Sequence, residues 1–156
     1  MENEKSFLEE VMIWNELLQI IVGCILVYIA INDFKTHKIT NRSLLTLLAV
    51  GLGATWQQPL TIFDRIIGTL LNGTPLLIIS MIKPKAFGGG DIKLAAIAGA
   101  MLGGGEGLMS QGTAFITGGI YSAVTLITGR AKRNDKFPFG PFICIGIAYC
   151  IFFVNS

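Results

Sequence analysis

The chain has 156 residues, of which 52% are hydrophobic and only 14% are charged, and its mean hydropathy is +0.64. This composition excludes a disordered chain and an ordinary soluble domain, and it indicates a membrane protein. A net charge of +2 argues against the strongly basic surface of a nucleic-acid binder, so no nucleic-acid partner is expected. The three cysteines, Cys24, Cys144 and Cys150, lie in apolar runs without a CxxC pair. They predict neither a disulfide framework nor a zinc ribbon.

Six apolar segments follow one another along the chain and predict about six membrane-spanning helices. The first covers residues 13–31, and at a rise of 1.5 Å per residue it would extend about 28 Å, close to the thickness of the hydrocarbon core. The others cover residues 44–56, 62–82, 92–109, 113–128 and 139–154. Acidic residues before the first segment argue against a cleaved signal peptide. We therefore expect an all-α, multi-pass membrane protein with one membrane-embedded domain over residues 1–156.

The basic residues lie almost entirely in alternate connections of this arrangement. Only Lys5 and Arg65 fall on the other side. The remaining ones follow the first, third and fifth segments: Lys35, Lys38, Arg42, Lys83, Lys85, Lys93, Arg130, Lys132, Arg133 and Lys136. Because Lys and Arg in short loops stay in the cytoplasm, these connections are predicted to be cytoplasmic and both termini to lie outside the cell membrane.

Two aspartates lie at predicted cytoplasmic helix ends. Asp33 follows the first apolar segment, and Asp91 follows residues 88–90, a run of three glycines, at the start of the fourth. Ionisable groups at a bilayer are often functional, although the cost of placing them falls toward the interface. Capping of a helix N-terminus explains Asp91 equally well, and pairing with Lys35 or Lys38 would explain Asp33 without catalysis.

If the two aspartates approach closely, they can share one proton and act as a general acid and base. One carboxylate would activate a water molecule while the other protonates the carbonyl or the leaving group, which is the chemistry of an aspartic protease. His37, the only histidine, is most simply a solvated loop residue, and the chain offers no set of metal ligands around it. No metal or other cofactor is predicted.

Three short motifs resemble those of the type IV prepilin peptidases. Residues 88–94, GGGDIKL, resemble the GxGD motif of that family, and residues 33–41 resemble the segment around its first catalytic aspartate. Residues 137–142, FPFGPF, are similar to the proline-rich start of its last helix. The resemblance covers essentially the whole chain. It implies that Asp33 and Asp91 are the catalytic pair and that Gly88, Gly90 and Lys93 contribute to substrate binding.

This resemblance implies a membrane aspartic endopeptidase. Its substrates would be type IV prepilin or pseudopilin precursors in the lipid bilayer, which would lose a short basic leader peptide at the cytoplasmic face. Larger members of the family resemble this chain but add paired CxxC zinc ligands and methylate the new N-terminus. This chain has no CxxC pair, and Thr40 replaces the proline often found before the asparagine of the first motif. Methyltransferase activity is therefore not expected.

Two other interpretations fit parts of the sequence. A small transporter or channel component could use Asp33 and Asp91 to bind a proton or cation, since glycine-rich helices suit such proteins as well. Internal repeats, which many transporters contain, are not evident, and both aspartates lie at helix ends instead of mid-membrane. A structural membrane subunit with capped helices is the third interpretation, and it leaves the three ordered motifs as coincidence.

Overall fold

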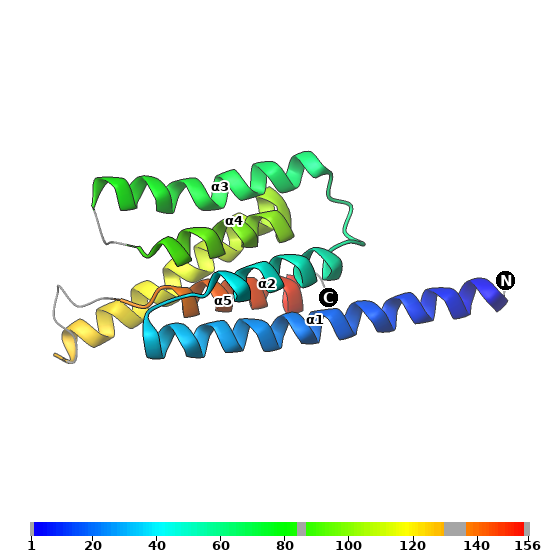
Figure 1. Ribbon diagram of the computed structural model, residues 1–156, viewed down its shortest axis with the longest axis horizontal. Helices are drawn as coiled ribbons and strands as arrows, with labels where there is room; N and C mark the ends of the chain where they lie inside the picture. The colour runs from blue at the N-terminus through cyan, green and yellow to red at the C-terminus, as the bar shows by residue number, and fades with distance from the viewer. Residues whose placement is uncertain (1, 84–86, 130–136, 155–156) are drawn as a thin grey trace.

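The computed structural model describes residues 2–83, 87–129 and 137–154, with side chains from residue 9 onward. Within these ranges the chain is helical and has no strand, which confirms the all-α prediction. The helices are packed as a bundle, and the first half of the N-terminal helix projects beyond it (Figure 1). The elements are α1 (Glu2–Thr36), α2 (Asn41–Ala54), α3 (Ile62–Ile82), α4 (Gly89–Ile127), α5 (Gly140–Tyr149) and a π-helical continuation, η1 (Cys150–Val154).

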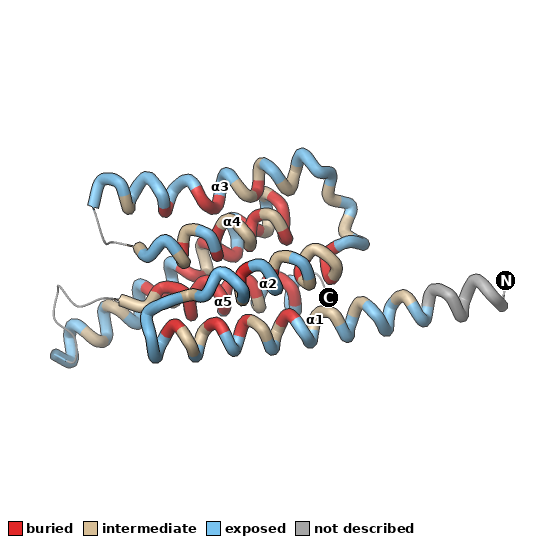
Figure 2. The backbone as a smooth tube through the Cα atoms, viewed as in Figure 1, coloured by how far each residue is buried: buried red, intermediate tan, exposed pale blue. Residues whose placement is uncertain are grey.

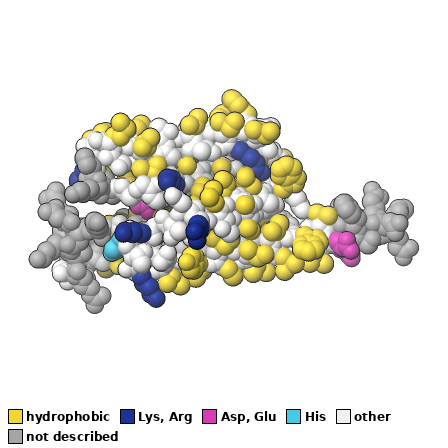
Figure 3. Space-filling view, viewed as in Figure 1, with side chains coloured by type: hydrophobic (Ala, Val, Ile, Leu, Met, Phe, Trp, Pro, Cys, Tyr) yellow, Lys and Arg dark blue, Asp and Glu magenta, His cyan; other side chains and the backbone are white. Residues whose placement is uncertain are grey.

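Three of these helices are long and apolar enough to cross a membrane, namely Glu9–Thr36 of α1, α3 and α4, and Gly140–Val154 forms a shorter apolar helix. The outer surface is apolar, with Ile62 79% and Phe153 78% exposed. Figure 3 shows apolar side chains along the flanks, while most of the visible Lys and Arg side chains lie toward the end opposite the N-terminus. Such a surface is suited to a bilayer. Lys85, Arg130, Lys132, Arg133 and Lys136 of the predicted cytoplasmic connections lie outside the described residues.

The longest helix, α4, folds back on itself at Gly103. Gly103 has φ 76° and ψ −173°, a backbone conformation open to glycine and strained for other residues. A Cβ at Gly107 would lie 3.2 Å from the Cα of Gly99, whereas eight residues of straight helix would separate them by about 12 Å. The chain therefore reverses at Gly103, as Figure 1 shows, and α4 consists of two antiparallel arms.

The predicted boundary between the fourth and fifth segments, at residues 109–113, is therefore wrong. Helical structure runs through this stretch, where Ser110 and Gln111 are buried within the bundle. Polar residues interrupt the apolar pattern there, but the backbone breaks several residues earlier, at the glycine run that begins with Gly103.

Buried residues lie on the sides of the helices that face one another (Figure 2). The core includes Leu47 of α2, Leu76 of α3, Leu94 of α4 and Ile147 of α5, none of which is accessible to solvent. Together with Val22, Leu26 and Ile29 of α1, these side chains belong to one apolar cluster. A second component of the packing is backbone contact through glycine.

Glycines bring α3 and α4 into direct backbone contact. A Cβ at Gly99 would collide with the carbonyl group of Gly68, and one at Gly107 would collide with the side-chain amide of Asn72. Asn72 is fully buried and donates a 2.9 Å hydrogen bond from Nδ2 to the carbonyl oxygen of Gly68. Small residues of this kind let helices approach closely where lipid provides no hydrophobic driving force.

Arg65 joins three helix ends on the side of the bundle where α4 reverses. Its Nη1 donates to the carbonyl oxygens of Ala100 and Met101, each at 3.1 Å, just before the break at Gly103. Its Nη2 donates to the carbonyl oxygen of Thr55, the C-cap of α2, at 2.8 Å. A cation is favourable at the negative end of a helix dipole. Arg65 thus caps the ends of α2 and of the first arm of α4. This role explains why a basic residue lies on the side opposite the predicted cytoplasmic connections.

We predict that Gly99→Ala destabilises the protein by about 1–3 kcal/mol, because the added methyl group overpacks the contact with Gly68. Gly112→Ala is the matched control, since it lies in the same helix and a Cβ there meets nothing within 4 Å. Thermal unfolding in detergent measures the effect. Equal unfolding midpoints for the two variants would contradict the close α3–α4 contact.

Candidate active site

Asp33 and Asp91 lie on one cavity although they come from opposite ends of two helices. Asp33 is in the last turn of α1 and Asp91 in the first turn of α4, and they are 4% and 7% exposed. They are close enough for direct electrostatic interaction. The cavity has a volume of about 300 Å³ and is lined by Asp33, His37, Lys38, Ile39, Gly88, Gly89, Gly90 and Asp91. The structure thus brings the two carboxyl groups to one cavity.

Asp91 also caps its own helix. Its Oδ2 accepts a 3.0 Å hydrogen bond from the backbone N–H of Gly88. Capping and a place in the cavity are therefore compatible, because the cap fixes the orientation of the carboxyl group that lines the cavity. Oδ2 of Asp33, in contrast, is buried and accepts no hydrogen bond from the described residues.

The N-terminus of α5 lies against both aspartates. Gly140, the first residue of α5, lies beside the carboxyl group of Asp33. A Cβ at Gly140 would lie 2.7 Å from Oδ2 of Asp33 and 3.0 Å from Cδ1 of Ile39. Since a helix N-terminus carries partial positive charge, this arrangement partly offsets the cost that burial imposes on a negative charge of the pair. The FPFGPF motif therefore contributes the Gly140 backbone, a role that reasoning from the sequence missed.

In the glycine run before Asp91, close packing requires the absence of a side chain at Gly90. A Cβ at Gly90 would lie 2.9 Å from the Cβ of Ile39, and one at Gly88 would lie 3.3 Å from Oδ2 of Asp91. At Gly89 a Cβ would meet nothing within 4 Å. The run thus allows the α1–α2 connection to pack against the start of α4, while its middle residue leaves space in the cavity.

Lys93 lies outside the cavity, whereas His37 is an exposed residue that lines it. Nζ of Lys93 donates a 3.1 Å hydrogen bond to Oδ1 of Asn41, which joins α4 to the start of α2. Its role in substrate binding stays a prediction. His37 has φ 50°, so it ends α1 in the left-handed conformation, and it interacts electrostatically with Asp33.

Aromatic side chains support the start of α5. Phe139 packs on Phe87 with ring centroids 4.9 Å apart, and Phe137 stacks on Phe142 at 5.3 Å.

Among the described residues, no three His, Cys, Asp or Glu side chains gather as a potential metal site. The polar side chains that line the cavity are thus the two carboxyl groups, His37 and Lys38.

Comparison with known proteins shows the family to which the chain belongs. Residues 20–123, which include both aspartates, match the family model described as the type IV leader peptidase family. The chain belongs to the type IV leader peptidase family. No solved structure matches the chain.

Among curated relatives of this leader peptidase family member is the "Prepilin leader peptidase/N-methyltransferase" of Bacillus subtilis (strain 168). It is 31% identical over 127 residues, which cover 78% of this chain and 50% of the relative. The chain therefore spans about half the length of that relative. The family match ends before α5, so it does not include Gly140.

A double-mutant cycle tests whether Gly140 lies against Asp33. We predict that Gly140→Ala destabilises the protein and that the cost falls by at least about 0.5 kcal/mol in an Asp33→Ala background, because the colliding carboxyl group is gone. Gly119→Ala is the control, since a Cβ there meets nothing within 4 Å, and it should show no coupling to Asp33. Unfolding in detergent measures all variants, and additive effects of Gly140→Ala and Asp33→Ala would refute the contact.

Proposed function

We propose that this protein is a membrane aspartic endopeptidase that removes the leader peptide from type IV prepilin-like precursors, with Asp33 and Asp91 as its catalytic pair. The observation that carries the proposal is the convergence of these two buried carboxyl groups on one cavity in a member of the leader peptidase family. The name of the Bacillus subtilis relative supports the choice of substrate.

The chemistry follows from two carboxyl groups that share one proton. The ionised group removes a proton from a water molecule, whose oxygen forms a bond to the scissile carbonyl carbon, while the protonated group donates to the carbonyl oxygen. As the C–N bond breaks, the leaving nitrogen takes up the proton that came from water, and a hydroxyl group of the tetrahedral intermediate returns its proton to the other carboxylate. The products are a carboxylic acid and an amine, and the aspartate pair again holds one shared proton. The N-terminus of α5 partly offsets the cost that burial imposes on the single negative charge.

We further propose that the protein is one multi-pass domain of six crossings with the aspartates at the cytoplasmic face of the cell membrane and both termini outside. This count takes the two arms of α4 as separate crossings and includes α2 and α5 with η1, each shorter than the roughly 20 residues of a full span. Basic residues at the helix ends on the side of the two aspartates, or in the α1–α2 connection there, support this orientation: Lys35, Lys38, Arg42, Lys83 and Lys93.

Replacement of either aspartate tests the catalytic pair. We predict that Asp33→Asn and Asp91→Asn each reduce cleavage of a co-purified prepilin at least about a hundredfold, because acid–base exchange through water needs both carboxyl groups. Asp64→Asn is the control. Asp64 caps α3 through Thr61, away from the cavity, so its replacement removes a carboxylate without touching the proposed site. A gel shift of the prepilin in the presence of EDTA gives the readout and excludes metal-dependent proteases.

Two results would contradict this proposal. Full cleavage by Asp33→Asn or Asp91→Asn would remove that residue from the mechanism. Absence of cleavage by the wild type, combined with aspartate-dependent proton or cation uptake into liposomes, would favour the transporter interpretation instead.

Cysteine labelling tests the orientation. In a background without the three native cysteines, we predict that Lys83→Cys in intact cells is protected from an impermeant maleimide and that Gln57→Cys reacts, because these residues flank opposite ends of α3. Both positions are exposed, so permeabilised cells should label both and provide the control. Labelling of Lys83→Cys from outside would reverse the orientation and remove the cavity from the cytoplasmic face.

A further inference from the structure

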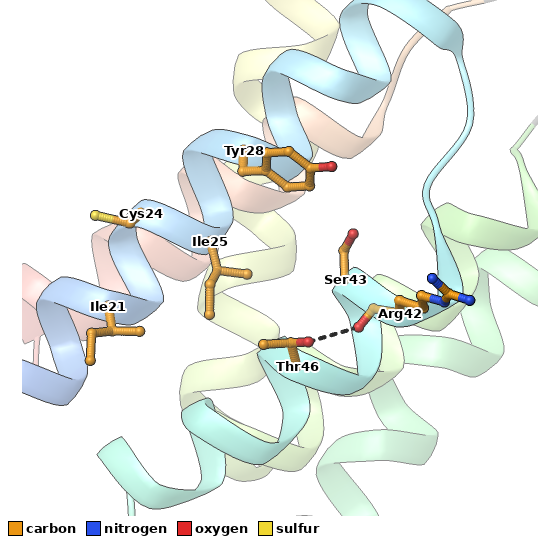
Figure 4. A pocket seen from close by; sticks show the side chains of 7 residues that line it. All are labelled: Ile21, Cys24, Ile25, Tyr28, Arg42, Ser43 and Thr46. Atoms are coloured by element: carbon orange, nitrogen blue, oxygen red, sulfur yellow. Dashed lines mark hydrogen bonds between the residues drawn. The ribbon is translucent and has the colours of Figure 1, made fainter.

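A second concave site lies outside the aspartate cavity, between α1 and α2. It is a groove of about 430 Å³, lined by Ile21, Cys24, Ile25, Tyr28, Arg42, Ser43 and Thr46 (Figure 4). No residue of this groove lines the aspartate cavity. Since α1 packs mainly against α2 and α5, the groove is at the edge of the bundle. It therefore opens to the surroundings of the protein, where a bilayer would supply lipid.

The groove is apolar at one end and polar at the other. Figure 4 shows Ile21 at one end of the gap, while the side chains of Tyr28, Arg42 and Ser43 lie toward the other. The polar end is close to the end of α1 that holds Asp33, because α2 begins at Asn41 after a short connection. The polar groups are thus at the depth of a membrane interface and the apolar wall is at the depth of acyl chains.

Arg42 is the charged side chain among the residues that line this groove, and it is exposed. Among the described residues its guanidinium group has no hydrogen-bond or ion-pair partner, whereas the guanidinium of Arg65 is bonded to three backbone carbonyls and Lys93 is bonded to Asn41. The Thr46 hydroxyl donates to the backbone carbonyl of Arg42 at 2.9 Å, so it is already used within α2. An unpaired guanidinium at the edge of hydrocarbon favours a counter-anion, and its planar fork matches a phosphate.

We propose that this groove binds one anionic phospholipid. The acyl chain lies along Ile21 and Ile25, and the headgroup phosphate contacts Arg42, with the hydroxyl groups of Tyr28 and Ser43 as further donors. Basic pockets between membrane helices on the cytoplasmic side bind anionic headgroups for this reason. The site is independent of the proposed peptidase activity, because it requires only the α1–α2 packing and the charge of Arg42.

Native mass spectrometry of the delipidated full chain in detergent tests the proposal. The protein is titrated with phosphatidylglycerol or with phosphatidylcholine of the same acyl chains, and bound lipids are counted. We expect the first phosphatidylglycerol to bind about fivefold more tightly than phosphatidylcholine, as one Lys or Arg contact provides. R42Q should lose this preference and R42K should keep most of it. K83Q removes one exposed positive charge outside the groove and should behave as the wild type.

A second variant tests the groove itself. Thr46→Phe, at an exposed position, fills the groove but leaves Arg42 in place, and we expect it to lose the first tightly bound lipid. Unchanged lipid selectivity in R42Q, an equal loss in K83Q, or unchanged binding in Thr46→Phe would each overturn the proposal. A dimer that Thr46→Phe abolishes would instead identify a second copy as the occupant. Loss of prepilin cleavage in Thr46→Phe with unchanged lipid binding would identify the helix of the substrate.

Discussion

The structure depends on the burial of two carboxyl groups at the point where the ends of α1, α4 and α5 meet. Buried carboxyl groups are costly unless hydrogen bonds and dipoles replace the water that they lose. The amide of Gly88 provides this for Asp91, and the N-terminus of α5 lies against the carboxyl group of Asp33. The three helix ends can meet only where side chains are absent, so glycine occupies the positions that face Ile39 and the carboxyl group of Asp33.

At the opposite end of the bundle, one cation, Arg65, binds backbone carbonyl groups at helix ends. The reversal of α4 at Gly103 leaves backbone carbonyls without helical partners, and Arg65 satisfies two of them together with the end of α2. This reversal also returns the second arm of α4 to the side of the aspartates, from which α5 can begin (Figure 1). Polar groups are therefore concentrated at the two ends, and the flanks remain apolar, as a bilayer requires.

The connection between α1 and α2 separates the two concave sites. Lys38 and Ile39 of this connection line the aspartate cavity, and Arg42, at the start of α2, lines the groove on the outside of the bundle. His37 begins the connection in a left-handed conformation that non-glycine residues adopt at some cost. A few residues thus link the proposed chemistry to the surface that faces lipid, which suits a substrate that reaches the cavity from within the membrane.

The sequence by itself determined the all-helical class, the family, and the placement of Asp33 and Asp91 at helix ends on one side, because apolar length, charge asymmetry and motif order are local properties of the chain. Only the tertiary structure decided the position of the break in α4. Ser110 and Gln111 look like a boundary but are buried by neighbouring helices, whereas the turn at Gly103 depends on a backbone angle that hydropathy does not record. The partners of Arg65 lie up to 36 positions away. The need for glycine at position 140 likewise arises from Asp33 and Ile39, which only folding brings against it.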